Sequence, residues 1–499
     1  MSLSSATNIA RSGLNTVTAE SSVLSRNISG ASDTAIYSRK IANVITMPGG
    51  GSQVASITRA TNLAVFGNML SATAANATQQ ALSSGLDTLN QTIGNVSSSS
   101  SSSASNSNSP AALLSNFTNA LQSYQASPGN LTLASAAVSA AATLTQGLNS
   151  AAATVNQVRE QADSGIATSV QTINSLLAQF QTVNTQIVNG TATGSDVTDA
   201  QDSRDNILTQ LAQQIGITAT TAATGNMSIY TDGGVTLFQG GAARSVTFTP
   251  ANSYTAATTG NAVFVDGVPI TGASATMPTV SGTIAGLATL RDNVAVTYQA
   301  QLDGIAGGLI KTFAESDQAG PGPNLPGLFT APAVTLPIIN PTGLAGQITV
   351  NPNADPNQGG NALLLRDGGI SGNSNYTYNA SDDASYTTRL TQLLTGLSAT
   401  QTFSANGSIT TSANLGNYAS ASVSWLEAQR SNASSQSTYQ STLLNTATTA
   451  LSNATGVNIN DEMSKMLDIE RSYSATAKLI STIDTMFGTL LADYGNIPA

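Results

Sequence analysis

The 499-residue sequence contains no cysteine and no histidine. Without cysteine, the chain can form no disulfide, no thiol nucleophile and no thiolate metal site. Without histidine, it lacks the usual general base and the commonest metal ligand. These absences exclude Ser-His-Asp catalysis and zincin-type sites and leave only chemistry that carboxylates can perform. The sequence therefore predicts a protein that is not an enzyme and has no catalytic residue, cofactor or metal site.

Charged residues are also scarce. They make up 8% of the chain, with 16 basic and 26 acidic residues and a net charge of −10, whereas a typical soluble domain carries about 25% charged residues. A nucleic-acid-binding surface needs clustered Lys and Arg, and no such cluster occurs, so no nucleic-acid partner is expected. Hydrophobic residues reach 40%, which is enough to build cores in a chain of two to four domains.

Targeting and membrane-spanning segments are not apparent. The first thirty residues lack a basic region followed by an apolar one, since Arg11 and Glu20 interrupt the stretch. No run of about 18 apolar residues occurs, so neither a cleaved signal peptide nor a membrane partner is expected. The composition, poor in charge and free of cysteine, nevertheless suits a protein that works outside a bacterium.

The two ends of the chain are predicted to be helices whose apolar residues recur every seven positions. Residues 3–28 carry such a seam, and residues 458–491 carry two. A seven-residue repeat is typical of helices that pack against other helices, so we expect the ends to pair with each other and with sister molecules. The predicted subunit-interface residues are Leu3, Ala10, Val17, Leu24 and Ile28 in the first helix, and Met466, Ile469, Tyr473, Ile480, Ile483, Phe487 and Leu490 in the last. The alternatives are an ordinary core-facing helix and, less favoured because its polar face is not rich in Lys and Arg, a membrane-lying helix.

Between these ends the pattern changes from helical to extended and back. Helices are predicted at residues 62–93, 131–188, 199–215, 287–313 and 423–451, a hairpin at 41–58, and a Ser-rich linker or surface loop at 97–110. Residues 217–281 contain short alternating runs separated by Asp232-Gly233 and Asp266-Gly267, which are typical hairpin turns. The predicted fold class is α+β, with a coiled-coil-like inner domain of paired terminal helices, a helical second domain and β-rich inserted outer domains.

The expected domain boundaries follow this pattern. Residues 1–32 with 458–499 form the inner domain, and residues 33–216 with 282–315 and 379–457 form the helical second domain. Residues 217–281 form a β-rich outer domain, and residues 316–378 form an irregular insertion rich in Pro and Gly.

Several segments resemble the family of bacterial flagellar hook-associated protein 1, which forms the hook–filament junction. The closing segment TGVNINDEMSKMLDIERSYSATAKLISTIDTMFGTLL (455–491) and the opening LNTVTAESSVLSRNISGASDTAIYSRK (14–40) are similar to the ends of that family. Internally, DSRDNILTQLAQQIGI (202–217) and GLATLRDNVAVTYQAQLDGIA (286–306) resemble two recurrent family segments, each with an Arg-Asp pair. The usual Asn-Thr-Pro-Gly-Tyr motif of axial flagellar proteins is replaced here by Asp-Thr-Ala-Ile-Tyr at residues 33–37.

The resemblance implies a structural subunit of an extracellular polymer that links hook and filament. It implies export in the unfolded state through the flagellar type III pathway, without a cleaved signal peptide. The implied partners are copies of this chain in a ring, the hook protein, a second hook–filament junction protein, and an export chaperone that holds the C-terminal helix. The alternatives are a secreted adhesin or surface-layer protein, for which no β repeat of fixed period is found, and a carboxylate-dependent hydrolase, which needs two convergent acids.

Most charged residues also have simpler interpretations. Asn458, with Asp461 three residues on, resembles a capping box at the start of the last helix. The acids Asp461 and Glu462 lack the spacing of a calcium loop, so we expect them to contribute to capping and to interact with the helix dipole. Adjacent residues on a helix do not face each other. The pairs Arg204-Asp205 and Arg291-Asp292 are expected to form surface salt bridges with other residues; the alternative, implied by the family resemblance, is that they orient the outer helical layer.

Overall fold

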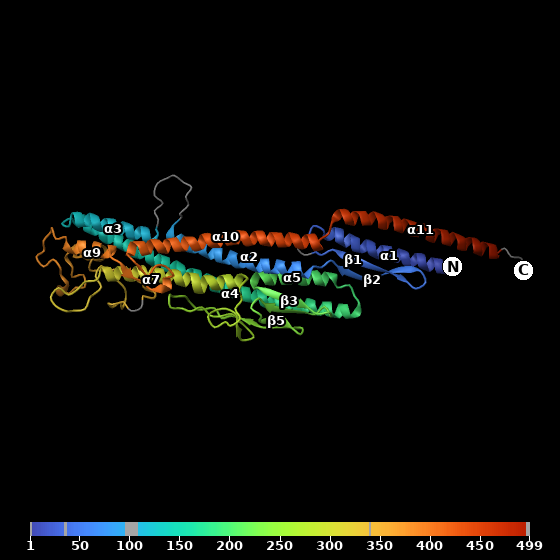
Figure 1. Cartoon of the computed structure of the whole chain (residues 1–499), viewed down its shortest axis with the longest axis horizontal. Coiled ribbons are helices and arrows are strands. Elements are labelled where there is room, and N and C mark those ends of the chain that lie inside the picture. The colour runs from blue at the N-terminus through green and yellow to red at the C-terminus, as the bar shows by residue number, and fades with distance from the viewer. Residues whose placement is uncertain (1, 34–36, 95–107, 339–340, 496–499) are drawn as a thin grey trace.

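The chain folds into a long rod with both termini at the same end (Figure 1). The computed structural model describes residues 2–33, 37–94, 108–338 and 341–495. The Ser-rich run, apart from its last residues, and residues 34–36 of the altered motif lie outside the described residues. Helices form most of the rod, and the strands belong to small sheets, so the α+β prediction is confirmed.

A bundle of long helices forms the trunk of the rod. Its members are α2 (Leu63–Asn90), α3 (Pro110–Ala126), α4 (Leu131–Thr193), α5 (Thr198–Gln214), α6 (Thr283–Thr289), α7 (Ala295–Thr312), α9 (Thr388–Ser398) and α10 (Leu415–Thr455). Helix α4 begins at Asn130, whose side chain accepts hydrogen bonds from the first turn, and ends at Gly194 in the left-handed conformation. Its 63 residues span about 95 Å at 1.5 Å per residue, so α4 is the axis of the trunk.

The core of the trunk is divided into two hydrophobic clusters. One surrounds Phe117, Phe313 and Phe329, whose ring centroids lie 5.0 to 5.5 Å apart in tilted and edge-to-face contacts. The other surrounds the apolar stripe of α4 from Ile166 to Phe180. All residues of both clusters belong to the part of the chain from the start of α2 to the end of α10, so the core lies in the trunk.

Helix α4 is apolar and long enough to cross a membrane by length and composition alone. Its apolar stripe is buried against α3, α5 and α7. A core helix passes the same test, so this finding is weak support for a membrane span.

Helix α3 was not anticipated from the sequence, because the expected linker extended to its first residue. Ser109 caps its N-terminus and Pro110 occupies its first turn, an arrangement that favours helix initiation. Apolar residues then recur at helical spacing, with Phe117 and Leu121 fully buried. The Ser-rich segment before it obscured this start signal.

Two small antiparallel sheets lie on one side of α4 and form the β-rich lobe. The first has the order β3-β4-β5-β6 and the second the order β7-β8-β9. At the tip of β8 and β9, Asp266 and Gly267 both have positive φ angles, as the two central residues of a type I′ turn require. The strands are β3 (Ile217–Thr221), β4 (Met227–Thr231), β5 (Thr236–Gln239), β6 (Ala242–Ala243), β7 (Val246–Thr247), β8 (Phe264–Val265) and β9 (Val268–Pro269).

The far end of the trunk carries the irregular Pro- and Gly-rich segment. It contains the short helix α8 (Leu364–Asp367) and the two-residue strands β10 (Phe329–Thr330) and β11 (Thr349–Val350), which pair with each other. A second two-residue pair, β12 (Gln401–Thr402) with β13 (Ser412–Ala413), lies between α9 and α10. Buried side chains of the Pro- and Gly-rich segment, including Phe329 and Ile348, join the first hydrophobic cluster. The segment therefore covers the core of the trunk.

The helix expected at residues 287–313 begins earlier and contains a π-helical turn at Leu290–Val294. Arg291 is fully buried in this turn. Its Nε and Nη2 donate to the two carboxylate oxygens of Asp292 at 2.8 Å each, and its Nη1 donates to Asp163 Oδ1 at 2.6 Å. The expectation of a surface salt bridge was wrong here: the π turn lies between α6 and α7, and the side chain is directed inward toward α4.

The terminal elements form a separate unit at the other end of the rod. This terminal unit consists of α1 (Leu3–Gly30), the hairpin β1 (Lys40–Met47) and β2 (Gly51–Arg59), and α11 (Ile459–Gly495). Helices α1 and α11 lie side by side (Figure 1), and the hairpin packs on α1. The expected division placed the hairpin in the second domain, whereas its contacts lie mainly with α1.

Candidate functional site

The two terminal helices pair in antiparallel fashion. Asn27 of α1 hydrogen bonds to Glu462 of α11, and Gly13 lies opposite Thr476, whose methyl group is 3.8 Å from the position of a Cβ on the glycine. The two contacts lie fourteen residues apart on α1 and fourteen apart on α11, so the two helices stay in register over about four turns. Their pairing in the fold confirms the expected inner arrangement.

A buried polar cluster closes one end of this pairing. Glu462 is 1% exposed and accepts from Asn27 Nδ2 at 2.8 Å and from Arg39 Nε at 2.7 Å. Asn27 also accepts from the backbone N–H of Lys40 at 2.9 Å and donates to its carbonyl at 2.9 Å. Burial by itself raises the pKa of Glu462, but the two hydrogen bonds and the charges of Arg39 and Lys465 outweigh it and lower the pKa. The carboxylate thus joins α11 to α1 and to the hairpin.

Glu462 has a role that the sequence pattern did not indicate. The expected cap Asn458 accepts from the N–H of Asn460 at 3.0 Å, but Glu462, which was expected to act at this helix end, binds α1 instead. Asp461 remains exposed. The local pattern could not indicate the interaction with α1, because Asn27 lies 435 positions earlier in the chain.

The predicted interface residues divide into three groups in the single chain. Ala10, Val17, Leu24 and Ile483 are buried, at 3%, 8%, 5% and 6% exposure. Leu3, Ile28, Ile469, Ile480 and Phe487 are partly buried, and Met466, Tyr473 and Leu490 are exposed, at 40%, 49% and 60%. The buried residues pack within one molecule, and the exposed ones remain available to another; that any of them contacts a sister molecule stays a prediction.

The exposed apolar surface of the terminal unit is larger than the heptad pattern indicated. One side of α11 presents apolar residues at spacings of three, four and seven, which share a helix face; this outer strip comprises Ile459, Met463, Met466, Leu467 and Tyr473, all at least 40% exposed. Further exposed apolar residues on α11 are Leu479, Met486, Leu490 and Leu491, and the hairpin adds Ile41, Val44, Ile45 and Met47. The heptad analysis missed most of these because it followed only two rows of the helix.

Ion pairs connect the terminal unit to α5 of the trunk. Asp205 of α5 accepts from Arg59 of β2 at 2.7 Å. Arg204 is buried and donates to the carbonyl of Gly225 at 2.8 Å. As expected, the two residues do not face each other, but Arg204 is buried rather than part of a surface salt bridge, and each residue binds a partner on a different element. Among the described residues, no group of three or more acidic side chains is arranged to hold a metal ion.

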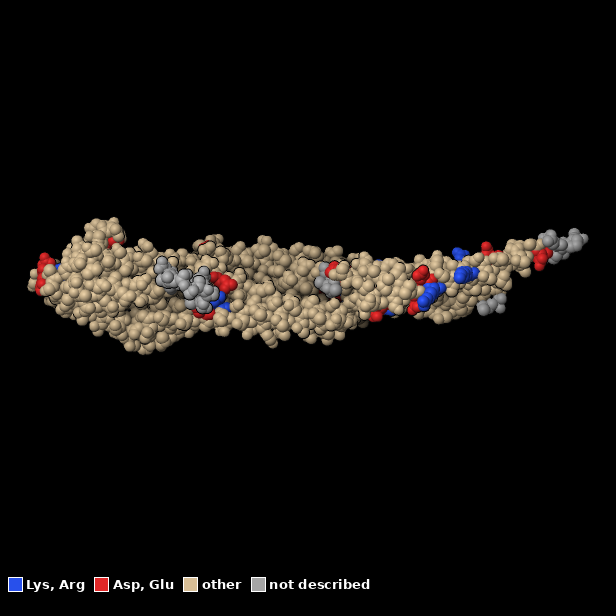
Figure 2. Space-filling model, turned by 90° about the horizontal axis from the view of Figure 1, so that it is seen from above, with Lys and Arg blue, Asp and Glu red and all other residues tan. Residues whose placement is uncertain are grey.

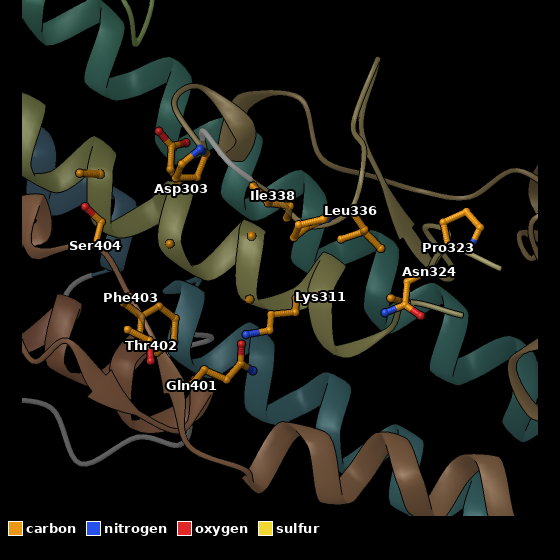
Figure 3. Close-up of a pocket in the computed structure, with 17 residues that line it drawn as sticks. Asp303, Lys311, Pro323, Asn324, Leu336, Ile338, Gln401, Thr402, Phe403 and Ser404 are labelled. Carbon is orange, nitrogen blue, oxygen red and sulfur yellow. The ribbon is translucent and has the colours of Figure 1, made fainter. Parts of the chain in front are cut away.

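A cavity lies in the trunk, far from the terminal unit (Figure 1). Its volume is about 590 Å³, and it is bounded by the glycine-rich side of α7, residues 336–338 and residues 401–404 (Figure 3). Among its described lining residues Asp303 is the one carboxylate, and it accepts from the N–H groups of Gly343 and Ala345 at 2.8 Å and from Gln299 at 2.9 Å. A hydrolase of the carboxylate type needs a second, facing acid, so this cavity offers no support for that alternative.

Comparisons with known proteins identify both parts of the rod. A family model described as the flagellar hook-associated protein FlgK helical domain matches residues 100–325, and one described as the C-terminal region of the flagellar basal body rod proteins FlgEFG matches residues 450–493. None of the curated protein sequences gives a significant match.

Among solved structures, the flagellar hook junction protein FlgK from Burkholderia pseudomallei is similar, with 20% identity over 53% of this chain and a TM-score of 0.41. The matched part spans 46% of that protein's length. The FlgK model matches the part of the trunk from α3 to α7 and the β-rich lobe, and the FlgEFG model matches the end of α10 and most of α11. The chain belongs to the FlgK family of flagellar hook-associated structural proteins.

Proposed function

We propose that this flagellar protein is the adaptor subunit of the hook–filament junction. It forms a ring of identical copies, with the hook protein on one side and a second junction protein on the other. It reaches this extracellular position unfolded through the flagellar type III pathway, without a cleaved signal peptide, while a chaperone holds its C-terminal helix. It performs no catalysis.

The apolar surface of the terminal unit is the observation that carries this proposal. Water-exposed apolar patches of this kind are typical of surfaces that bind other proteins. The outer strip and the exposed side of the hairpin lie on elements outside the core of the trunk. Contacts between a patch on one copy and a different patch on the next build rings or helical arrays, depending on whether the rotation closes.

The proposal also assigns the domains. The terminal unit is the inner domain, the trunk helices are the second domain, and the β-rich lobe and the irregular segment are outer parts. This division keeps the boundaries expected from the sequence, except that residues 40–59 join the inner domain because the hairpin contacts α1.

Charge substitutions in the outer strip test this function. Met463→Asp and Leu467→Asp place charges on exposed positions of α11, so the variants should fold as the parent protein does. In cells that lack the native protein, we expect these variants to give hooks without filaments and to release filament subunits into the medium. Ser464→Asp adds the same charge at a neighbouring exposed position outside the strip and should leave filaments normal.

Variants at the partly buried Ile480 and the buried Ile483 examine the other side of α11. Ile480→Asp and Ile483→Asp should also block incorporation and leave the β-rich lobe folded. Normal filaments in cells that carry the strip variants, or a chain without α11, would contradict the proposal and favour an adhesin or surface-layer role.

A further inference from the structure

Acidic residues form a row along the start of α5. Asp199, Asp202 and Asp205 are spaced three apart and share one face of the helix, and Asp196 precedes its first turn, where it accepts from the N–H of Thr198 at 3.0 Å. Negative charge at a helix N-terminus is favoured by the helix dipole. We call these four aspartates the acidic row.

Three cations of the terminal unit meet this row, each from a different element. Arg26 of α1 contacts Asp196 and Asp199, both at 2.8 Å. Arg59 of β2 contacts Asp202 at 2.9 Å and Asp205 at 2.7 Å.

Lys40 of β1 is the third cation and lies between the two arginines. Its side chain is 1% exposed, donates to Asp199 and lies 3.6 Å from Asp202. Its ammonium group also lies 4.4 Å from the centre of the Tyr37 ring. A buried lysine without partners is unfavourable, so this position requires the facing carboxylates.

The aspartates of the row differ in protonation behaviour: burial raises the pKa of Asp202 and of Asp205 despite the facing Arg59, whereas the pKa values of Asp199 and Asp196 are lowered. Burial raises the pKa of Asp199, but hydrogen bonds from Lys40 and Arg26 outweigh it and lower the pKa. The same balance lowers the pKa of Asp196. Both groups therefore carry their charge at neutral pH and attract the facing cations.

Apolar packing contributes little to this contact. Neither hydrophobic cluster of the trunk includes a described residue of α1, the hairpin or α11. The chain crosses between the two parts at residues 60–62, before α2, and at residues 456–458, between α10 and α11. Charged residues recur along the terminal unit, whereas most of the trunk surface visible in Figure 2 shows neither basic nor acidic residues. The terminal unit is thus held to the trunk by two short links, a set of ion pairs and a backbone hydrogen bond from the N–H of Arg39 to the carbonyl of Thr455 at 2.8 Å.

We propose that the acidic row and its three cations form an electrostatic latch that sets the angle between the terminal unit and the trunk. When the latch is weakened, the terminal unit pivots about the two links while both parts keep their own folds. The latch is a property of the single chain, so it stands or falls independently of the adaptor function.

Salt dependence separates this latch from an apolar contact. The Debye length falls from about 10 Å at 0.1 M salt to about 3 Å at 1 M, which weakens ion pairs in contact with solvent. Apolar contacts are not weakened by screening. The partly exposed pairs of Arg26 should therefore weaken at high salt and loosen the joint, whereas the buried pairs of Lys40 and Arg59 are screened much less. A joint held by apolar burial should not loosen.

The absence of cysteine makes a distance measurement straightforward. Cysteines are introduced at two exposed positions, Thr482 of α11 and Gln210 of α5. Each cysteine carries a spin label, and pulsed electron spin resonance measures the distance between the two labels. We expect a narrow distance distribution at 0.05 M salt that broadens at least twofold at 1 M.

A charge reversal and its compensation test the named residues. In this doubly labelled chain, Arg26→Glu should broaden the distribution at low salt, because it places a third negative charge beside Asp196 and Asp199. Adding Asp196→Arg restores an opposite-charge pair and should narrow the distribution again. Arg11→Glu makes the same charge change on the same helix, at an exposed residue with no ion pair among the described contacts, and should leave the distribution unchanged.

Circular dichroism and the melting temperature of the trunk establish that each variant is folded. A distribution that stays narrow in the folded Arg26→Glu variant would overturn the latch. A distribution that the second substitution fails to narrow, or one that is insensitive to salt in the parent chain, would overturn it as well.

Discussion

Substitution of Asp163 by alanine should release the β-rich lobe from the trunk. Asp163 lies on α4 and accepts hydrogen bonds from Arg291 Nη1 at 2.6 Å, from the Tyr254 hydroxyl at 2.7 Å and from the N–H of Ala251 at 2.8 Å. Tyr254 and Ala251 belong to the lobe segment between β7 and β8, and Arg291 belongs to the π-helical turn. One carboxylate therefore joins three parts of the chain.

The size of the effect follows from burial. Arg291 is 0% and Asp163 2% exposed, so removal of the carboxylate leaves a buried cation with a lost partner. Breaking a buried ion pair by removing one member costs about 3–5 kcal/mol. Asp292 still pairs with Arg291, so we expect a loss near the lower limit, about 3 kcal/mol.

Unfolding in urea, followed by circular dichroism, measures this loss. Limited digestion with chymotrypsin reports on the lobe itself, because Tyr254 is 4% exposed and should become a cleavage site when its hydroxyl loses Asp163. Arg244→Ala removes an exposed pair with Asp266 in the same lobe, at 3.5 Å, and should change the stability by less than about 0.5 kcal/mol.

Replacing both charges separates the cost of the unpaired cation from the value of the contact. Asp163→Ala combined with Arg291→Met removes the buried charge, so the double variant should be less destabilised than the sum of the single variants. A loss below about 1 kcal/mol for Asp163→Ala, or no new cleavage after Tyr254, would refute the assignment of this cluster as the anchor of the lobe.

Three further predictions concern the terminal unit. The pKa of Glu462 is lowered in the fold. Its contribution to stability is therefore present above the unfolded pKa of about 4.5 and is lost as the pH falls through the lowered folded pKa. Amide exchange of α1 should accelerate below about pH 4 in the parent chain, and Glu462→Gln should abolish this pH dependence. Gly30→Ala would place a Cβ 2.5 Å from the Tyr37 ring, so the ring must move and amide protection in the hairpin should fall by about 1–3 kcal/mol; unchanged protection would show that the ring moves freely. Ile483→Ala opens a cavity against α1 and should weaken the pairing of the two helices by about 2–5 kcal/mol, measured by hydrogen exchange, while the exposed Thr482→Ala should have no effect.

Periodic segments of the sequence predicted their elements well. The two terminal helices, the stripe of α4 from Ile166 to Ile187 and the two Asp-Gly turns all appear in the fold, because a repeat of apolar residues or a turn dipeptide acts over a few neighbouring residues. The sequence did not predict helix α3, because its start signal adjoins a low-complexity run. It did not predict the π turn either, because no local pattern marks where one extra residue enters a helix.

The charged residues were the least predictable part of the chain. Local spacing indicated a cap for Glu462 and surface bridges for Arg204 and Arg291, whereas the fold gives each a partner on a distant element. Charges interact across space, and their partners depend on which helices pack together rather than on their neighbours in the chain.

The sequence by itself determined that this chain lacks the residues for most catalysis, that its ends are amphipathic helices and that its middle alternates between helical and extended segments. These properties depend on residue chemistry and short-range periodicity. The tertiary structure decided which side of α11 is covered by α1, which side remains exposed, and which carboxylates hold the terminal unit to the trunk. The free energy of a buried contact or ion pair depends on the positions of atoms that the chain brings together only when it folds.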